Sequence, residues 1–511
     1  MLLSFKLWAQ ENNTSDVVNT VYVIRKIDFD ITGRTQPYYL MLNGELHEGE
    51  RIIGQENFDR YINRRIQTLN NQRVLDDTAT KIVYFLDEPE ADGAIPVRLL
   101  VTAKDAWNFI VLPYPKYDSN DGFSLTLKAR DYNFLGTMSP LRIDAGYKLD
   151  NDSKHSFNLM FDSDIPFRAF DLDWEINFDH YFNLAIGKKL YYQNVTGLLV
   201  KMPVSFTTMT LGFNHYLTFN EEISAGNKAA YGHTNDYYDP YGTSELYASF
   251  GIPLGIEAGE FGQLYYTPRV SAKLNYPYSK MDEPHKPAAT ISHSIGFGRV
   301  NWIGNLRQGL TASLGNSNTW NIDRSDAPLE INLDLNTAFY WPFNKIIGFN
   351  ARLKYRHFWK WSDKNNNWLS FSGAGNVLRG VIDNDIDAYY MLSLNLELPV
   401  RVLRFWPSDW LNNQNLRYFN FEMFFSPFFD FAMIESPYSK LKNNGATKFG
   451  FEDMVSTTGL EVVVFPAITR SLYIRGSLGY NISKINERGL PLKWGFFPQW
   501  DEIYIGVDLH F

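Results

Sequence analysis

Three charged residues in the carboxy-terminal half have the types and spacing that a charge-assisted clasp needs. Arg379 and Gly380 stand in Leu-Arg-Gly-Val at 378–381, and the acids Glu397 and Asp430 follow among alternating apolar residues. Because a guanidinium carries a planar fork of donors, it can bind two carboxylates and hold a long loop against two strands. From spacing alone, a solvated arginine and two ordinary lumen-lining acids are the simpler interpretation.

The sequence patterns of known catalytic and metal sites are absent. There is no G-x-S-x-G elbow, P-loop or H-E-x-x-H segment, and the nine histidines are scattered along the chain. The lack of cysteine excludes disulfides and thiolate sites. A net charge of -9 gives no footprint for nucleic acid. We therefore expect no enzyme, no cofactor and no metal site.

The carboxyl end predicts a strand with two different faces. Residues 501–511 alternate strictly, so that one apolar face carries Ile503, Ile505, Val507, Leu509 and Phe511, while Tyr504 and Gly506 belong to the mixed face. This period of two suits a strand between lipid and a wet lumen, although a strand of a soluble sandwich can alternate in the same way.

Composition favours a membrane barrel over membrane helices. Aromatic residues make up 16% of the chain, which suits the two interfacial girdles of a barrel. The mean hydropathy is -0.29, and no apolar run approaches the roughly 18 to 20 residues of a spanning helix. A chain of this kind that crosses a bilayer must do so as a closed barrel.

The region 122–511 is predicted to be that barrel. It contains about seventeen alternating runs, one too many for an even barrel of about sixteen antiparallel strands, so we expect one assignment between 150 and 220 to be wrong. Short turns such as 150–152 alternate with long polar excursions such as 220–241 and 433–455. This asymmetry is typical of periplasmic turns and extracellular loops.

The amino-terminal part has a different texture. Residues 1–16 are interpreted as the remnant of an export signal or a disordered terminus. Residues 17–110 are expected to form a small α+β domain, and 111–121 a linker. One helix is predicted from an apolar stripe that recurs every three or four residues at Phe58, Ile62, Ile66 and Leu69. The expected order is strand (22–29), short helix (36–42), longer helix, strand (78–87) and strand (95–104).

Several motifs together give the chain a resemblance to outer-membrane assembly proteins of the BamA/TamA type. The order of the amino-terminal elements resembles one POTRA module, with Thr32-Gly33-Arg34 in place of the usual turn. Asp131, Asn133 and Gly136 resemble the turn after the family's first barrel strand, although Met138 replaces a second glycine. The segment 378–381 resembles the family's loop motif, with Val381 in the aromatic position, and the spacing at the carboxyl end resembles its β-signal, carried by Tyr504, Gly506, Leu509 and Phe511.

The resemblance implies a location, partners and a mechanism. It implies an outer membrane of a diderm bacterium, with the amino-terminal domain in the periplasm and Arg379 held by Glu397 and Asp430. It also implies insertion or translocation of nascent outer-membrane polypeptides, with accessory assembly proteins bound by the POTRA-like domain and lipid around the barrel. A lateral seam is expected between the strands 122–131 and 501–511, with its residues at Gly122, Thr126, Asp131, Ile505 and Val507.

Three alternatives stay open at this point. A passive porin would need neither a tethered loop nor a periplasmic domain. A dedicated exoprotein pore of the two-partner type usually carries two POTRA modules and a plug helix, and a third alternative is a scaffold barrel within a larger complex.

Overall fold

In this computed structural model the chain divides after Asp105 into an amino-terminal unit and a larger carboxy-terminal unit. The residues that the structure describes are 20–118, 122–150, 153–205, 207–223, 234–276, 287–322, 328–361, 369–370, 377–381, 387–388, 390–439, 445–467, 473–484 and 502–506. The predicted export-signal remnant, and the predicted residues Val507, Leu509 and Phe511, lie outside them.

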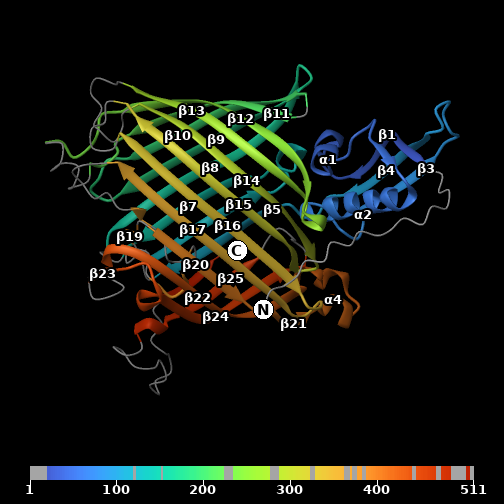
Figure 1. Ribbon diagram of the computed structural model, residues 1–511. Coiled ribbons are helices and arrows are strands. Elements are labelled where there is room, and N and C mark those ends of the chain that lie inside the picture. Colours follow the sequence, from blue (N-terminus) through green and yellow to red (C-terminus); the bar gives the residue numbers. More distant parts are fainter. Residues whose placement is uncertain are drawn as a thin grey trace. The chain divides into compact units, whose positions relative to one another are not determined.

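The amino-terminal unit is a four-stranded sheet with two helices, coloured blue in Figure 1. Its strands run in the order β2-β1-β4-β3, with β1 and β4 parallel and the other pairs antiparallel. The expected order of elements is confirmed, with one short strand added between the helices. The elements are β1 (Val21–Thr32), α1 (Pro37–Asn43), β2 (Arg51–Ile53), α2 (Gln55–Asn71), β3 (Lys81–Leu86) and β4 (Ile95–Lys104).

The predicted apolar stripe forms the inner face of α2. Phe58, Ile62 and Leu69 are buried, while Ile66 is half-buried. The ring of Phe58 stacks on Tyr22 of β1 with 4.5 Å between centroids, which fixes the helix on the sheet. Among the residues described, no helix is long and apolar enough to cross a membrane.

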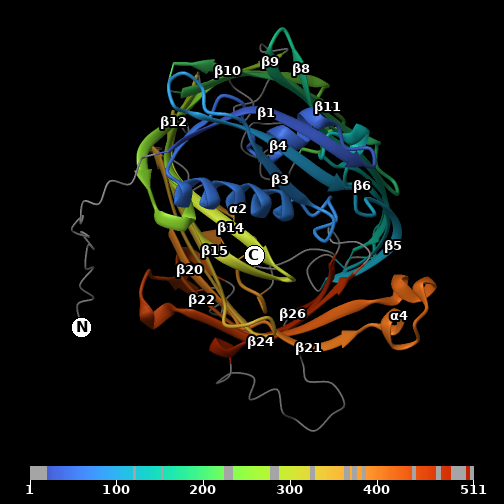
Figure 2. The same ribbon diagram turned by 90° about the vertical axis from the view of Figure 1, so that its right-hand side faces the viewer.

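The carboxy-terminal unit is a closed antiparallel barrel (Figures 1 and 2). Eighteen strands form the ring, and the short strands β21 and β23 pair alongside β22. Ring strands before the internal loop are β5 (Phe109–Asp118), β6 (Gly122–Asp131), β7 (Leu141–Leu149), β8 (His155–Ala169), β9 (Leu172–Ala185), β10 (Tyr191–Val204), β11 (Thr207–Phe219), β12 (Tyr241–Glu257), β13 (Gln263–Tyr276), β14 (Ala288–Ile303), β15 (Leu306–Asn321), β16 (Leu329–Pro342) and β17 (Gly348–Trp361).

The remaining elements follow the loop between β17 and β20, which contains a two-stranded ladder of β18 and β19. Their bounds are β18 (Leu369–Ser370), β19 (Asp387–Ala388), β20 (Tyr390–Glu397), β21 (Val400–Phe405), α4 (Pro407–Trp410), β22 (Phe421–Ser439), β23 (Gly445–Thr447), β24 (Val455–Pro466), β25 (Ile474–Asn481) and β26 (Glu502–Gly506). Short 3-10 turns occupy Phe134–Gly136, Gly259–Phe261, Gln414–Phe419, Phe451–Asp453 and Ile482–Lys484.

The barrel fold is confirmed, but its strand count and its first strand differ from the prediction. Each predicted run contains a ring strand, so none between 150 and 220 had to be removed. The additional ring strand is β5, which makes the number of strands even. It occupies most of the segment 111–121, which was predicted to be a linker. Pro113 and Pro115 concealed this strand, because proline cannot donate to a ladder and normally argues against a strand.

The two faces of the wall follow from the alternation of each strand. On β20, Ser393, Asn395 and Glu397 are buried beneath the internal loop, so this face points into the lumen. Leu394 on the opposite face pairs with Leu353 of β17. Paired residues of an antiparallel ladder lie on the same face of the sheet. The register therefore identifies the outward-facing residues on each neighbouring strand in turn.

Candidate functional site

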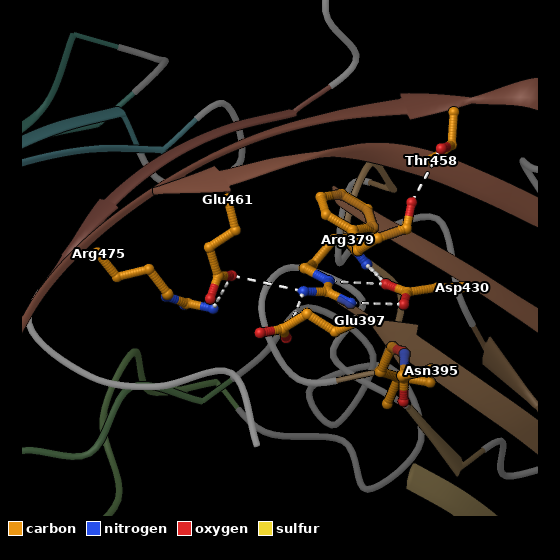
Figure 3. Close-up of polar contacts among 9 residues, drawn as sticks. Arg379, Asn395, Glu397, Asp430, Thr458, Glu461 and Arg475 are labelled. Carbon is orange, nitrogen blue, oxygen red and sulfur yellow. Dashed lines mark hydrogen bonds and ion pairs between the residues drawn. The ribbon is translucent and has the colours of Figure 1, made fainter. Parts of the chain in front are cut away.

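The candidate site is a buried arginine on the loop between β17 and β20. Leu378 and Arg379 are both fully buried, and Gly380 after them has φ +87°. Positive φ at this point turns the chain so that the arginine side chain runs along the inner wall, and glycine adopts it without strain. Figure 3 shows the guanidinium between carboxylates from neighbouring strands.

Asp430 of β22 is the principal partner of Arg379. Nε donates to Oδ2 at 2.9 Å and Nη2 to Oδ1 at 2.7 Å, which is the bidentate geometry of a strong arginine–carboxylate pair. The backbone N–H of Arg379 also donates to Oδ2, at 3.1 Å. One aspartate therefore holds both the side chain and the backbone of the loop.

Glu397 of β20 is the second partner that the sequence predicted. Its Oε2 lies 3.2 Å from Nη1 of Arg379. The ring of Phe428 stacks on the guanidinium of Arg379, and the distance from Cζ to the ring centroid is 3.8 Å. This is a cation–π contact in a buried environment. The structure thus brings Arg379, Glu397 and Asp430 together, and their role as a clasp stays a prediction.

Sequence reasoning missed two further charged members of this cluster. Glu461 of β24 lies 3.5 Å from Nη1 of Arg379 and 3.3 Å from Nη1 of Arg475 on β25. Both residues are almost fully buried. The signal was present, since Glu461 alternates with Leu460 and Val462, but the alternation gives only the face of a strand and not which loop residue meets it.

A backbone contact seats the loop on β25. A Cβ added to Gly479 would lie 2.4 Å from the backbone nitrogen of Gly380, and one added to Gly380 would lie 2.8 Å from the nitrogen of Tyr480. Neither position has room for a side chain. The loop therefore approaches the wall as closely as backbone atoms permit, one strand away from β26.

The cluster pairs opposite charges from four strands and one loop. Two guanidiniums meet the three carboxylates of Glu397, Asp430 and Glu461 within the lumen wall. Buried charges of this kind are tolerated only when they are paired, and removal of one partner costs about 3–5 kcal/mol. The arrangement can bind and fix a loop; within the described residues, no group of three or more His, Asp or Glu side chains is placed to hold a metal.

The predicted turn around Asp131 is formed by its side-chain acceptors. Asp131 Oδ1 accepts from the backbone N–H of Asn133 at 3.1 Å, and buried Asn133 accepts from the N–H of Met138 at 2.9 Å. Met138 has φ +59°, the conformation in which the family's second glycine was expected. The turn therefore forms despite the substitution, at the cost of a non-glycine residue in the left-handed region.

The predicted seam residues on the amino-terminal side are wrong. Gly122 and Thr126 lie on β6 with Asp131, and β6 pairs with β5 and β7 along its length. The ring closes instead between β26 and β5, where Tyr504 is in register with Asp118. Ile505 and Gly506 lie on β26 and pair with Gly476 and Arg475 of β25.

Comparison with known proteins gives fold-level similarities only. No family model and no curated protein matches the chain. The chain is similar to BamA from Haemophilus ducreyi lacking POTRA domains 1-3, with 14% identity over 95% of this chain and 85% of that one and a TM-score of 0.42. It is also similar to CdiB from Acinetobacter baumannii, with 11% identity, 96% and 74% coverage and a TM-score of 0.49. The similarity to CdiB from Escherichia coli has 9% identity over 99% of this chain and 93% of that one, with a TM-score of 0.41.

Proposed function

We propose that this chain is an outer-membrane barrel of a diderm bacterium that inserts or translocates other polypeptides through a lateral opening between β26 and β5. The observation that carries the proposal is the pair of prolines in β5. Pro113 and Pro115 lie two residues apart on a strand that pairs continuously with β6. Their missing N–H groups therefore fall on the side that faces β26.

Other strand prolines of this barrel obey the same geometry. Pro166, Pro203 and Pro268 each have a register partner on one side only. At Pro268 the ladder to β14 continues while the ladder to β12 is interrupted. Proline is thus tolerated where one side of a strand needs no donor, which supports an unpaired edge on β5.

An edge of this kind suits exchange with an incoming strand. Among the described residues, β26 and β5 share the single register pair Tyr504–Asp118. Unpaired N–H and C=O groups at a strand edge can capture an extended segment, and main-chain hydrogen bonds then supply the affinity. A client segment would pair with β5 or β26 and fold against the wall.

The arginine cluster supports the same function by holding the wall beside the opening. Asp430, Glu461 and Arg475 come from β22, β24 and β25, the last of which pairs with β26. With these strands fixed to the internal loop, separation is confined to the strand pair beyond them. A porin would instead use an open lumen, whereas here the loop residues 377–381 are buried against the wall.

The amino-terminal unit is proposed to be a POTRA-like periplasmic domain that receives clients. Its strand β3 pairs with β4 on one side only, and Tyr84, Phe85 and Leu86 on it are exposed. An exposed apolar edge strand is a platform for β-strand addition by an extended polypeptide. We propose that accessory assembly proteins bind this domain as well, that lipid surrounds the barrel, and that no cofactor takes part.

Photo-crosslinking in cells tests the proposal. A benzophenone amino acid at Val111 of β5 should capture outer-membrane polypeptides during their assembly. The same group at Val270 of β13 is the matched control, because both valines are 51% exposed. Equal capture at the two positions, or none at Val111 in a folded barrel, would contradict lateral exchange.

A further inference from the structure

Every histidine on a described barrel strand faces outward and contacts a tyrosine hydroxyl. The hydroxyl-to-Nδ1 distances are 2.6 Å for Tyr147–His155, 3.1 Å for Tyr192–His180, 3.1 Å for Tyr276–His215, 2.6 Å for Tyr266–His293 and 3.1 Å for Tyr355–His357. We call these five pairs the histidine–tyrosine belt. An outward histidine is expensive against hydrocarbon, so its repetition on separate strands needs an explanation.

The strand register establishes that these side chains point away from the lumen. His357 of β17 shares its face with Leu353, the partner of outward Leu394. From His357 the paired positions run through Leu333 and Asn316 to His293. Exposed apolar residues share the outward face with the other histidines, including Phe157 beside His155, Ile176 beside His180 and Phe213 beside His215.

All five histidines lie at the same end of their strands. His155 begins β8, and each of the others lies within five residues of a strand end on the same side of the barrel. The connections on this side are long at 220–240 and 277–287 and short at 150–154 and 186–190. None is near the opposite strand ends, where β8 and β9 are joined at 170–171 and β14 and β15 at 304–305. The belt therefore runs along the outer wall from β8 to β17 near one end of the barrel.

The outward surface changes polarity at the belt. Asn194 is in register with His180, Ser244 with His215, and Asn316 with His293, so polar groups accompany the histidines around the wall. Two residues further toward the tight turns, five outward positions are apolar, while Thr196 and Tyr355 stand at that level on β10 and β17. The apolar positions are Phe178, Phe213, Leu246, Ile295 and Leu314. Such a transition marks the boundary between headgroups and acyl chains.

The tautomer of each imidazole decides what the ring can offer to a ligand. At His155 and His293 the phenol oxygen lies 2.6 Å from Nδ1. When the O–H donates to Nδ1, the ring carries its proton on Nε2, which is then a donor to an acceptor outside the wall. At His215 the phenol oxygen lies 3.1 Å from both ring nitrogens, and the Nε2 of His357 is buried, so His357 is not one of these donors. At His215 this pairing spans two strand intervals, because the ring of Tyr276 lies over Gly242 and would contact a Cβ there at 2.4 Å. The glycine leaves room for the phenol to reach the imidazole.

We infer that the histidine–tyrosine belt binds the phosphate-bearing headgroups of the lipid leaflet at the long-loop end of the barrel. Phosphate oxygens are acceptors near the end of the barrel where the imidazole donors lie. The inference rests on the proposed membrane function. It adds a specific lipid contact that sets the height of the barrel in the bilayer.

Lipid titration of the purified full chain, followed by native mass spectrometry, tests the inference. The probes are phosphatidylglycerol and, in parallel, a phosphate-free diglucosyl diacylglycerol. A combined His180→Phe, His215→Phe and His293→Phe variant keeps ring shape and removes the donors. We expect its affinity for phosphatidylglycerol to fall about tenfold, as the loss of several exposed hydrogen bonds implies, with the glycolipid unaffected.

Controls separate a headgroup contact from a structural role. The matching His→Gln triple variant keeps a donor and should retain most of the phosphatidylglycerol affinity, and His47→Phe in the amino-terminal unit should change nothing. If the triple variant does not fold, as judged by heat-modifiable migration, His293→Phe and Tyr266→Phe are measured singly.

Unchanged phosphatidylglycerol affinity in a folded Phe variant would overturn the inference, as would an equal loss for both lipids. Loss of a protein partner with lipid affinity intact would overturn it too. Lipid binding is measured without a client, so crosslinking at Val111 reports separately on the proposed function.

Discussion

The closing pair of the barrel and the wall opposite it are built on the same alternating pattern but differ in pairing. Strands β14 and β15 remain in register over their whole length, from Ala288–Asn321 to Ile303–Leu306. Strands β26 and β5 share Tyr504–Asp118 among the described residues, and β5 carries two prolines on that side. Two N–H donors are therefore missing from the side of β5 that faces the closing pair, whereas β14 and β15 are paired from end to end.

The same comparison explains where the buried charge is placed. The arginine cluster lies on β20, β22, β24 and β25, and β25 pairs with β26 of the closing pair. A wall that must not open needs no such fixture. We propose that the cluster fixes the wall next to the opening, because separation would otherwise spread along the sheet.

Removal of Arg379 should have the largest effect on the stability of the wall beside the closing pair. Arg379→Ala leaves the carboxylates of Asp430 and Glu397 buried without their arginine partner, and we expect a loss of about 3–5 kcal/mol in the free energy of unfolding. Denaturant unfolding of the purified barrel measures it, and protease cleavage within 362–389 reports release of the loop.

The control for this variant is Arg142→Ala. Arg142 also pairs with an aspartate across the lumen wall, but its side chain is 43% exposed. We expect a change of about 1 kcal/mol or less there. Similar losses for the two alanine variants would show that the buried cluster is not special.

A methyl group at the loop–wall contact should have the next largest effect. In Gly479→Ala the new Cβ would meet Gly380 at 2.4 Å, so loop and strand must separate, which costs about 1–3 kcal/mol as overpacking does. Gly315→Ala on β15 is the control, because its nearest neighbour is 3.8 Å away. Loop cleavage that stays at the native rate in Gly479→Ala would refute the close seating of the loop.

Additional hydrogen bonds between β5 and β26 should make this closing pair more like the continuous pair β14 and β15. The double variant Pro113→Val and Pro115→Val restores two N–H donors on the side facing β26, each worth about 0.5–1.5 kcal/mol if paired. We expect a more stable barrel that assembles clients more slowly. Pro203→Val, at a rim position with one partner strand, is the control. Faster client assembly in the double variant would exclude a role for the proline edge.

The smallest effect is expected at the edge of the amino-terminal sheet. Phe85→Lys on β3 places a charge on an exposed edge and should weaken binding of extended peptides while changing stability by less than about 0.5 kcal/mol. Ile53→Lys tests the opposite edge strand, β2, where the side chain is 56% exposed. Peptide binding lost equally through both substitutions, measured by fluorescence anisotropy, would argue against β3 as the receiving edge.

Much of this architecture could be predicted from the sequence, and the exceptions have physical causes. The alternation of apolar and polar residues predicted where the strands lie. It also predicted that Glu397 and Asp430 face the lumen. It did not give Glu461, Arg475 or Gly479, since alternation fixes a face but not the level at which a loop meets it. Strand β5 was missed because its prolines look like a linker, although they are compatible with a strand that lacks one neighbour.

Some sequence predictions concern residues outside the described part of the chain. The role of Phe511 in a carboxy-terminal β-signal stays a prediction, as does that of Leu509. Deletion of Phe511 should leave the protein unassembled and protease-sensitive. Cell fractionation with a heat-modifiability assay measures that outcome, and a normally embedded barrel would refute it.

Locking the closing pair is the most direct test of lateral opening. The chain has no native cysteine, so Asp118→Cys with Tyr504→Cys can form one disulfide across β5 and β26, within the roughly 7 Å reach between Cα atoms. Ser124→Cys with Lys148→Cys, between β6 and β7, is the interior control. We predict that oxidation stops client assembly in the first variant, that reduction restores it, and that oxidation leaves the control active. If the oxidised, locked barrel assembles clients at the same rate as the chemically reduced protein, that result would contradict a lateral opening between β26 and β5.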